Sequence, residues 1–226
     1  MDTSIMNNTK IPHLPHPFYP LEVEIVGYLA NDWSVPALLG LFAAGWAVIL
    51  AVTLSVVKRF NPQVPSWERA VIMWFILSGT IHFFFEGYFA FNHAHMAGMN
   101  DFFAQLWKEY SLSDSRYLTS DPFVLCMETV TAVLWGPLSY IVAWMIVIEH
   151  PLRYPLQALV CIGELFGLVL PEAYYFWFYY FFMNFIWMVI PGWLLYVSID
   201  KTAKAFEAVK KMSKTVKGNG NPKKSN

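Results

Sequence analysis

An apolar run reads Phe123-Val-Leu-Cys-Met-Glu-Thr-Val-Thr-Ala-Val-Leu-Trp135, and it continues without a second charge as far as Ile148. Its one charged side chain is Glu128. A carboxylate in the middle of a membrane span costs roughly 2.5–3.5 kcal/mol on insertion scales, so such groups usually face a protein interior and carry a function. The same anomaly recurs in two other apolar runs, at Glu86 and Glu164. The pattern predicts an all-α membrane protein with ionisable groups inside its bundle.

The composition agrees with this prediction. Of the 226 residues, 57% are hydrophobic and only 14% are charged, which is not the balance of a soluble domain. Eight of the fifteen basic residues follow Asp200, yet nucleic acid is a poor explanation for a basic tail on so apolar a chain. The two cysteines, Cys126 and Cys161, fall inside apolar runs, so we expect both to be reduced packing residues.

Five apolar segments stand out, and about 20 residues of helix cross a bilayer core. They are Val35–Val57, Ala70–Phe91, Phe123–Ile148, Tyr154–Leu170 and Tyr174–Ile199. We therefore expect a five-transmembrane-helix bundle with an intramembrane ligand cavity. The chain divides into a polar N-terminal segment (1–32), a transmembrane domain (33–199) and a lysine-rich tail (200–226). The basic residues of the tail place it in the cytosol by the positive-inside rule. The aromatic residues of the 92–122 connection suit a membrane interface.

Two helical pairs of residues are candidates for acid–base chemistry. His82 and Glu86 lie four apart and share a helix face, so the histidine can order the carboxylate or share its proton. Glu128 and Thr131 lie three apart and share a face of the third apolar segment. The Gly136-Pro137 step that follows them should kink this helix. The alternative is that these polar groups only join helices together.

Further candidates come from the last apolar segment and from the histidines. Asn184 is the only amide of an aromatic-rich run, and Trp187 shares its face and offers a π surface to a cation. Glu164 is equally consistent with a pocket and with a helix–helix contact. His93 and His95 are too few for a closed metal site, which uses three or four ligands. We expect neither a metal nor a cofactor.

Several motifs together resemble the emopamil-binding protein family, the sterol Δ8–Δ7 isomerases with an EXPERA domain. They are His82-Phe-Phe-Phe-Glu86-Gly-Tyr, Gln105-Leu-Trp-Lys-Glu-Tyr110, Asp114-Ser-Arg-Tyr117, Cys126-Met-Glu-Thr-Val-Thr-Ala132, Leu134-Trp-Gly-Pro-Leu138 and Tyr175-Phe-Trp-Phe-Tyr179. The likeness spans about Trp33 to Ser198. The chain departs from the family pattern after Gly167, because it lacks a longer polar loop before Tyr174. That departure concerns the end of the fourth helix and one rim of the pocket.

The resemblance implies a five-helix, often dimeric enzyme of the endoplasmic reticulum membrane. Its substrate would be a sterol whose C8=C9 double bond moves to C7=C8, and cationic amphiphilic amines would bind as mimics of the carbocation. The matching functional positions are His82, Glu86, Glu128, Thr131, Asn184 and Trp187. The terminal Lys223-Lys224-Ser225-Asn226 resembles a dilysine retrieval signal of that membrane.

The chemistry of the residues agrees with this implication. Protonation of an alkene needs a neutral acid, and desolvation favours the neutral form of a carboxyl group. A second, ionised carboxylate would stabilise the cation and remove a proton. Two other interpretations stay open at this point. The chain is a sterol- or amine-binding protein without turnover, or it is a structural membrane protein whose polar groups only join helices.

Overall fold

The computed structural model describes residues 16–166 and 182–219, and every regular element in those two ranges is a helix. The bounds of the longer helices are α1 Val35–Phe60, α2 Ser66–Thr80, α3 Gly87–Asn92, α4 Phe102–Tyr110, α5 Pro122–Val130, α6 Gly136–Val147, α7 Arg153–Phe166 and α8 Phe182–Asn219. Short 3-10 turns, η2 at Met96–Gly98 and η3 at Ser115–Tyr117, lie in the connections.

Three of the described helical stretches are long and apolar enough to cross a membrane. They are Val35–Phe60, Ser66–Asn92 and Pro122–Val147, which confirms the first three predicted segments to within a few residues. The second stretch joins α2 to α3, and the third joins α5 to α6. The fourth predicted segment begins in α7, and the fifth ends within α8. The end of the fourth and the beginning of the fifth fall in residues 167–181, which lie outside the described part of the chain. The protein is therefore an all-α membrane protein.

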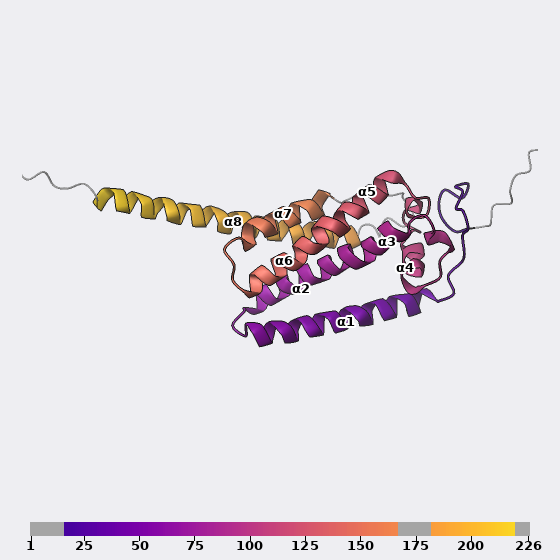
Figure 1. The fold of residues 1–226 in the computed structure, drawn as a ribbon, viewed down its shortest axis with the longest axis horizontal. Coiled ribbons are helices and arrows are strands. Elements are labelled where there is room, and N and C mark those ends of the chain that lie inside the picture. Colours follow the sequence, from indigo (N-terminus) through magenta and orange to yellow (C-terminus); the bar gives the residue numbers. More distant parts are fainter. Residues whose placement is uncertain (1–15, 167–181, 220–226) are drawn as a thin grey trace, which may run out of the picture.

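The long helices lie roughly side by side along the long axis of the molecule, and the short helix α4 lies across that direction at one end (Figure 1). Their shared core contains buried residues from α2, α6, α7 and α8, with Phe75, Val142, Val160 and Leu194 among them. Helix α1 packs loosely along α2, and only Leu38 and Val57 of its 26 residues are buried. Helix α8 continues well past the bundle, so its last turns project beyond the other helices (Figure 1).

One end of the bundle is closed by a short helix in a connection for which the sequence predicted no helix. Helix α4 begins after Asp101, whose carboxylate accepts hydrogen bonds from the first free backbone N–H groups of the helix. The N-terminal stretch from residue 16 packs on α4, and Phe18 and Ile25 join a buried cluster with Phe89 and Trp107. This layer lies over the ends of α3 and α5.

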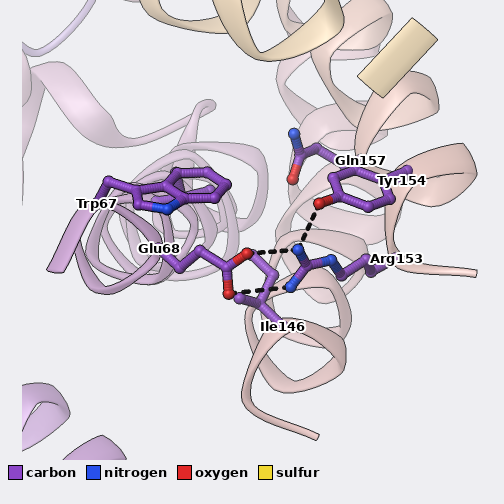
Figure 2. Close-up of a pocket in the computed structure, with 7 residues that line it drawn as sticks. Trp67, Glu68, Ile146, Arg153, Tyr154 and Gln157 are labelled. Carbon is purple, nitrogen blue, oxygen red and sulfur yellow. Dashed lines mark hydrogen bonds and ion pairs between the residues drawn. The ribbon is translucent and has the colours of Figure 1, made fainter. Parts of the chain in front are cut away.

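A salt bridge joins α2 to α7 near the opposite end. The guanidinium of Arg153 donates hydrogen bonds to both carboxylate oxygens of Glu68, and a further hydrogen bond to the hydroxyl of Tyr154. Figure 2 shows these groups beside Trp67, around a small pocket between the two helices. Both oxygens of this buried carboxylate are therefore used.

Candidate active site

Both helices that carry the predicted acid–base residues widen locally into a π-helical turn. The first, η1, spans Ile81–Glu86, and the second, η4, spans Thr131–Trp135. In each turn a glycine N–H reaches back five residues, from Gly87 to the carbonyl of His82 and from Gly136 to that of Thr131. Such turns are rare, and they often occur at functional sites. The two π turns contact one another, so the site lies where both helices are widened.

The sequence predicted a kink at Gly136-Pro137, and the structure has the π turn η4 immediately before this step. A proline within a helix has no N–H to donate and crowds the carbonyl of the residue four positions before it. A wider turn relieves that crowding. Helix α6 then resumes with proline in its first turn, where the missing N–H costs nothing.

The absence of side chains at two glycines allows the two π turns to approach one another closely. A Cβ atom on Gly136 would lie only 3.0 Å from the backbone nitrogen of Phe83. A Cβ on Gly79 would lie 3.1 Å from the carbonyl oxygen of Gly136. A side chain at either position would push the helices apart. Glycine therefore brings the helix of His82 and Glu86 close to that of Glu128.

The predicted pairing of His82 with Glu86 is confirmed. His82 Nδ1 lies 2.8 Å from Glu86 Oε2, and the histidine is 5% exposed. A third carboxyl group, from Glu164 on α7, approaches the other face of the pair, with its Oε1 4.0 Å from His82 Nε2. The Ser78 hydroxyl donates a hydrogen bond to the same Glu164 oxygen. Glu164 therefore belongs to the candidate site as well as joining α7 to α2.

Glu128 faces the same cluster from helix α5. Its carboxyl group lies within electrostatic contact of both Glu86 and His82. The hydroxyl of Tyr117 donates a hydrogen bond to Glu128 Oε1 at 2.7 Å. The Thr131 hydroxyl instead donates to the Glu128 backbone carbonyl at 2.9 Å, so it supports the helix rather than the carboxyl group in this structure.

Tyr117 is a site residue that the sequence reasoning did not identify. It lies in η3, in the connection whose aromatic residues were expected at a membrane interface, yet it packs against Trp107, which is 2% exposed. Burial is the main reason why the pKa of Tyr117 lies well above its ordinary value, followed by the nearby Tyr110 and Glu128. Its hydroxyl therefore stays protonated and remains a donor. The Asp114-Ser-Arg-Tyr motif was noted in the sequence, but nothing in its spacing pointed to Glu128.

Trp107 also ties α4 to the first π turn. Its indole N–H donates to the carbonyl oxygen of Phe85 at 3.0 Å, and its ring stacks on the Phe85 ring at 4.4 Å. The contact occupies a backbone oxygen of the π turn. Trp107 is buried against protein, because α4 folds back over the end of the site.

The remaining candidates lie on α8. Trp187 is half-buried, and its ring packs on that of Trp74 with centroids 5.0 Å apart. Trp74 in turn lies beside Glu164, so Trp187 reaches the carboxyl cluster through one intervening ring. Asn184 belongs to the first turn of α8, but its side chain lies outside the described part of the structure.

Neither the cysteines nor the other histidines add ligands to the site. Both cysteines are free thiols, as expected, although Cys126 is exposed rather than packed. Within the described residues there is no group of three or more histidine, cysteine or acidic side chains placed to hold a metal ion.

This arrangement can move protons inside a membrane. A site of low dielectric makes it costly for two facing carboxyl groups to ionise together. A histidine beside one carboxyl and a tyrosine beside the other hold the pair in place. The structure thus describes an integral membrane protein with a cluster of carboxyl, imidazole and phenol groups between its helices.

The comparisons with known proteins name the family. The model of the EXPERA (EXPanded EBP superfamily) family matches residues 102–198. The 3-beta-hydroxysteroid-Delta(8),Delta(7)-isomerase of Cavia porcellus is 35% identical over an alignment of 207 residues, which covers 82% of this chain and 88% of the relative. The Rattus norvegicus protein of the same name is 36% identical, with 84% and 90% covered. A probable enzyme of that name from Oryza sativa is 30% identical, with 90% and 99% covered. This chain belongs to the EXPERA superfamily.

The alignment with the Cavia porcellus relative is 207 residues long but covers only 82% of the 226 residues of this chain. The relative therefore contains residues that stand opposite gaps in this chain. The site residues described above lie before residue 167 or within α8.

Proposed function

We propose that this protein is a sterol Δ8–Δ7 isomerase, an intramolecular isomerase that moves a ring double bond from C8=C9 to C7=C8. The observation that carries the proposal is the pair of facing, half-buried carboxyl groups, Glu86 and Glu128, between two spans, with a histidine hydrogen-bonded to Glu86. The names of the family relatives support the same reaction and a sterol substrate.

The reaction balances with one proton added and one removed. A neutral carboxyl group donates its proton to C9, which leaves a tertiary cation at C8. An ionised carboxylate then removes the proton from C7, and the C7=C8 bond forms. Glu86 with His82, and Glu128 with Thr131 and Asn184, divide these roles. The carboxylate charge and the π face of Trp187 stabilise the cation.

Exclusion of water is the second requirement, because water would trap the carbocation. The layer formed by α4 and the N-terminal stretch covers the end of the site nearest Glu128, and the buried Trp107 is part of it. Tyr117 brings a neutral hydroxyl from this layer to Glu128. The site thus has a polar interior beneath an aromatic cover.

The proposal includes a setting for the enzyme. Residues 33–199 form a five-span domain around an intramembrane sterol cavity, in the endoplasmic reticulum membrane, with residues 200–226 in the cytosol. Exposed lysines of α8 such as Lys201 and Lys210 would face anionic lipid there. Cationic amphiphilic amines would bind beside the carboxyl groups as analogues of the cation, and a homodimer is the proposed assembly.

The test is complementation of a yeast strain that lacks its own sterol isomerase, with sterols identified by mass spectrometry. The native chain should restore Δ7-sterols, and Glu128→Gln should leave Δ8-sterols in their place. If Δ8-sterols persist with the native chain present in the membrane, the isomerase proposal fails. Binding of a cationic amphiphilic amine by that inactive chain would then identify a binding protein of the same fold.

A further inference from the structure

Glu164 is a third carboxyl group in the site, and the proposed reaction needs only two. Its side chain is fully buried, and it comes from α7, whereas the other two carboxyl groups come from the second and third spans. The Ser78 hydroxyl donates to Oε1, which fixes the carboxyl group against α2. That same oxygen lies 4.0 Å from His82 Nε2.

His82 therefore has a carboxyl group facing each of its ring nitrogens. Nδ1 lies 2.8 Å from Glu86, and Nε2 faces Glu164 at ion-pair distance. Within the described residues, neither Nε2 nor Glu164 Oε2 makes a hydrogen bond. An imidazole donates from both nitrogens only when it is protonated and positively charged. A carboxylate near each nitrogen stabilises that form.

Packing alone does not account for an acid at this position. A glutamine would accept the same hydrogen bond from Ser78 and would avoid placing a third carboxyl group in an apolar helix, which is costly in a membrane. A glutamate differs from a glutamine here only in its negative charge, which matters when a nearby group can become positively charged. The titratable group that its carboxyl faces at 4.0 Å is His82.

We propose that Glu164 is a positioning residue that acts through His82, holding the imidazole between two carboxyl groups as a doubly protonated cation. The inference rests on the proposed isomerase function and deepens it. A cationic His82 offsets the negative charge of Glu164, so the cluster as a whole carries the one negative charge of a Glu86–Glu128 pair that holds one proton for the alkene.

The charge on His82 depends on the acidic groups that face it from the neighbouring elements. Glu86 shares its π turn, Glu128 approaches from α5, and Glu164 approaches from α7. Ser78 on α2 contacts Glu164 rather than the histidine, and Trp74 on α2 also lies beside Glu164. The positive charge thus has three acidic neighbours, of which only Glu164 lies outside the proposed catalytic set.

The first experiment reads the charge of His82 without turnover. The full chain is labelled with ¹⁵N-histidine in lipid nanodiscs, and the His82 signals are identified by their loss in His82→Asn. In the native chain both ring nitrogens should carry a proton near neutral pH. In Glu164→Gln the ring should lose its second proton at a pH about 1 unit lower, because one of its negative neighbours is gone.

Two variants control this experiment. Glu164→Asp keeps the charge and should keep the native His82 signals. Glu68→Gln makes the same chemical change at a buried carboxyl group near the other end of the helix, where its partner is Arg153. It should leave His82 unchanged. The proposal is overturned if Glu164→Gln gives native His82 signals, or if Glu68→Gln shifts them equally.

The second experiment is the pH profile of sterol isomerisation. If the His82 cation is needed, activity falls at high pH as the ring loses its proton. Because Glu164→Gln makes that loss easier, its alkaline limb should move about 1 unit to lower pH. A lower rate with an unshifted limb would show a merely structural role and overturn the inference. A native chain without isomerase activity would overturn the proposed function, and the NMR titration would still decide the role of Glu164.

Discussion

The helical stretch Ser66–Asn92 carries one carboxyl group near each end, a buried one at Glu68 and a half-buried one at Glu86, and the two have opposite surroundings. Glu68 meets a guanidinium that donates to both of its oxygens. Glu86, eighteen positions on in the sequence, shares a single histidine with two other carboxyl groups. The first arrangement leaves no charge to respond to a ligand. In the second arrangement three carboxyl groups surround one histidine, so acidic groups outnumber basic ones and can exchange protons. This excess of acidic groups distinguishes the reactive site from a structural ion pair.

The sharpest way to break this comparison is to neutralise the reactive end. Glu86→Gln should lower isomerase activity by at least about 100-fold, because the site loses one of its two acid–base groups. Sterol conversion per molecule of membrane-inserted protein measures the effect. The same substitution at Glu68 should leave conversion per molecule near the native value. Equal losses in the two variants would contradict the distinction.

The paired end should show its effect in stability instead. Glu68→Gln should lower the free energy of unfolding by about 3 kcal/mol, because the Arg153 side chain, which is only 13% exposed, is left without a balancing charge. Thermal unfolding in detergent measures the loss. The double variant Glu68→Leu with Arg153→Met should recover most of it, since an apolar pair can replace a buried salt bridge. A double variant as unstable as the single one would show that the charges themselves are required.

The spacing of the two π turns can be tested with a matched pair of glycines. Gly136→Ala should destabilise the protein by about 1–3 kcal/mol and lower activity, because the new methyl group meets the backbone of Phe83. Gly192→Ala on α8 meets nothing within 4 Å, so it should be neutral or slightly stabilising, as expected for alanine in a helix. Similar behaviour of the two variants in thermal unfolding and sterol conversion would refute the close-approach argument.

The smallest effect is expected at the phenol. Tyr117→Phe removes the hydroxyl that donates to Glu128, and it should lower activity by about tenfold, the value of one hydrogen bond to a charged group. Burial holds the pKa of Tyr117 above its ordinary value, so this hydroxyl keeps its proton and should not add a limb to the pH profile. Tyr110→Phe, in the same aromatic cluster, should have a weaker effect. A native rate for Tyr117→Phe would remove the phenol from the site.

Much of the site followed from the sequence because its signals are local. A histidine four residues before a glutamate predicts their contact, and the structure has it at 2.8 Å. A lone acid in an apolar run predicts an inward-facing group, and Glu128 meets this expectation. The limits of the first three long helices were likewise predicted to within a few residues, because apolar length is a property of the chain itself.

The parts that did not follow depend on the packing of distant segments. The sequence gives no sign of a π turn, since Ile81–Glu86 has the same apolar character in either helical form. The contact of Tyr117 with Glu128 requires the connection to fold back over the bundle, through helix α4. The nearness of Glu164 to His82 requires the register of α7 against α2, across 82 residues of sequence. The position of Trp187 relative to the carboxyl groups depends on Trp74 of α2, whose ring lies between them.

The neighbouring indoles of Trp74 and Trp187, whose planes are inclined by 56°, give this protein an internal optical reporter. Two indoles 5.0 Å apart are close enough for their strong far-ultraviolet transitions to couple, so the pair should produce a split band in far-ultraviolet circular dichroism. One ring belongs to α2 and the other to α8, and the first lies beside Glu164. A hydrophobic ligand that wedges between the two helices would separate the rings and abolish the splitting, which would give a label-free titration of occupancy in native lipid.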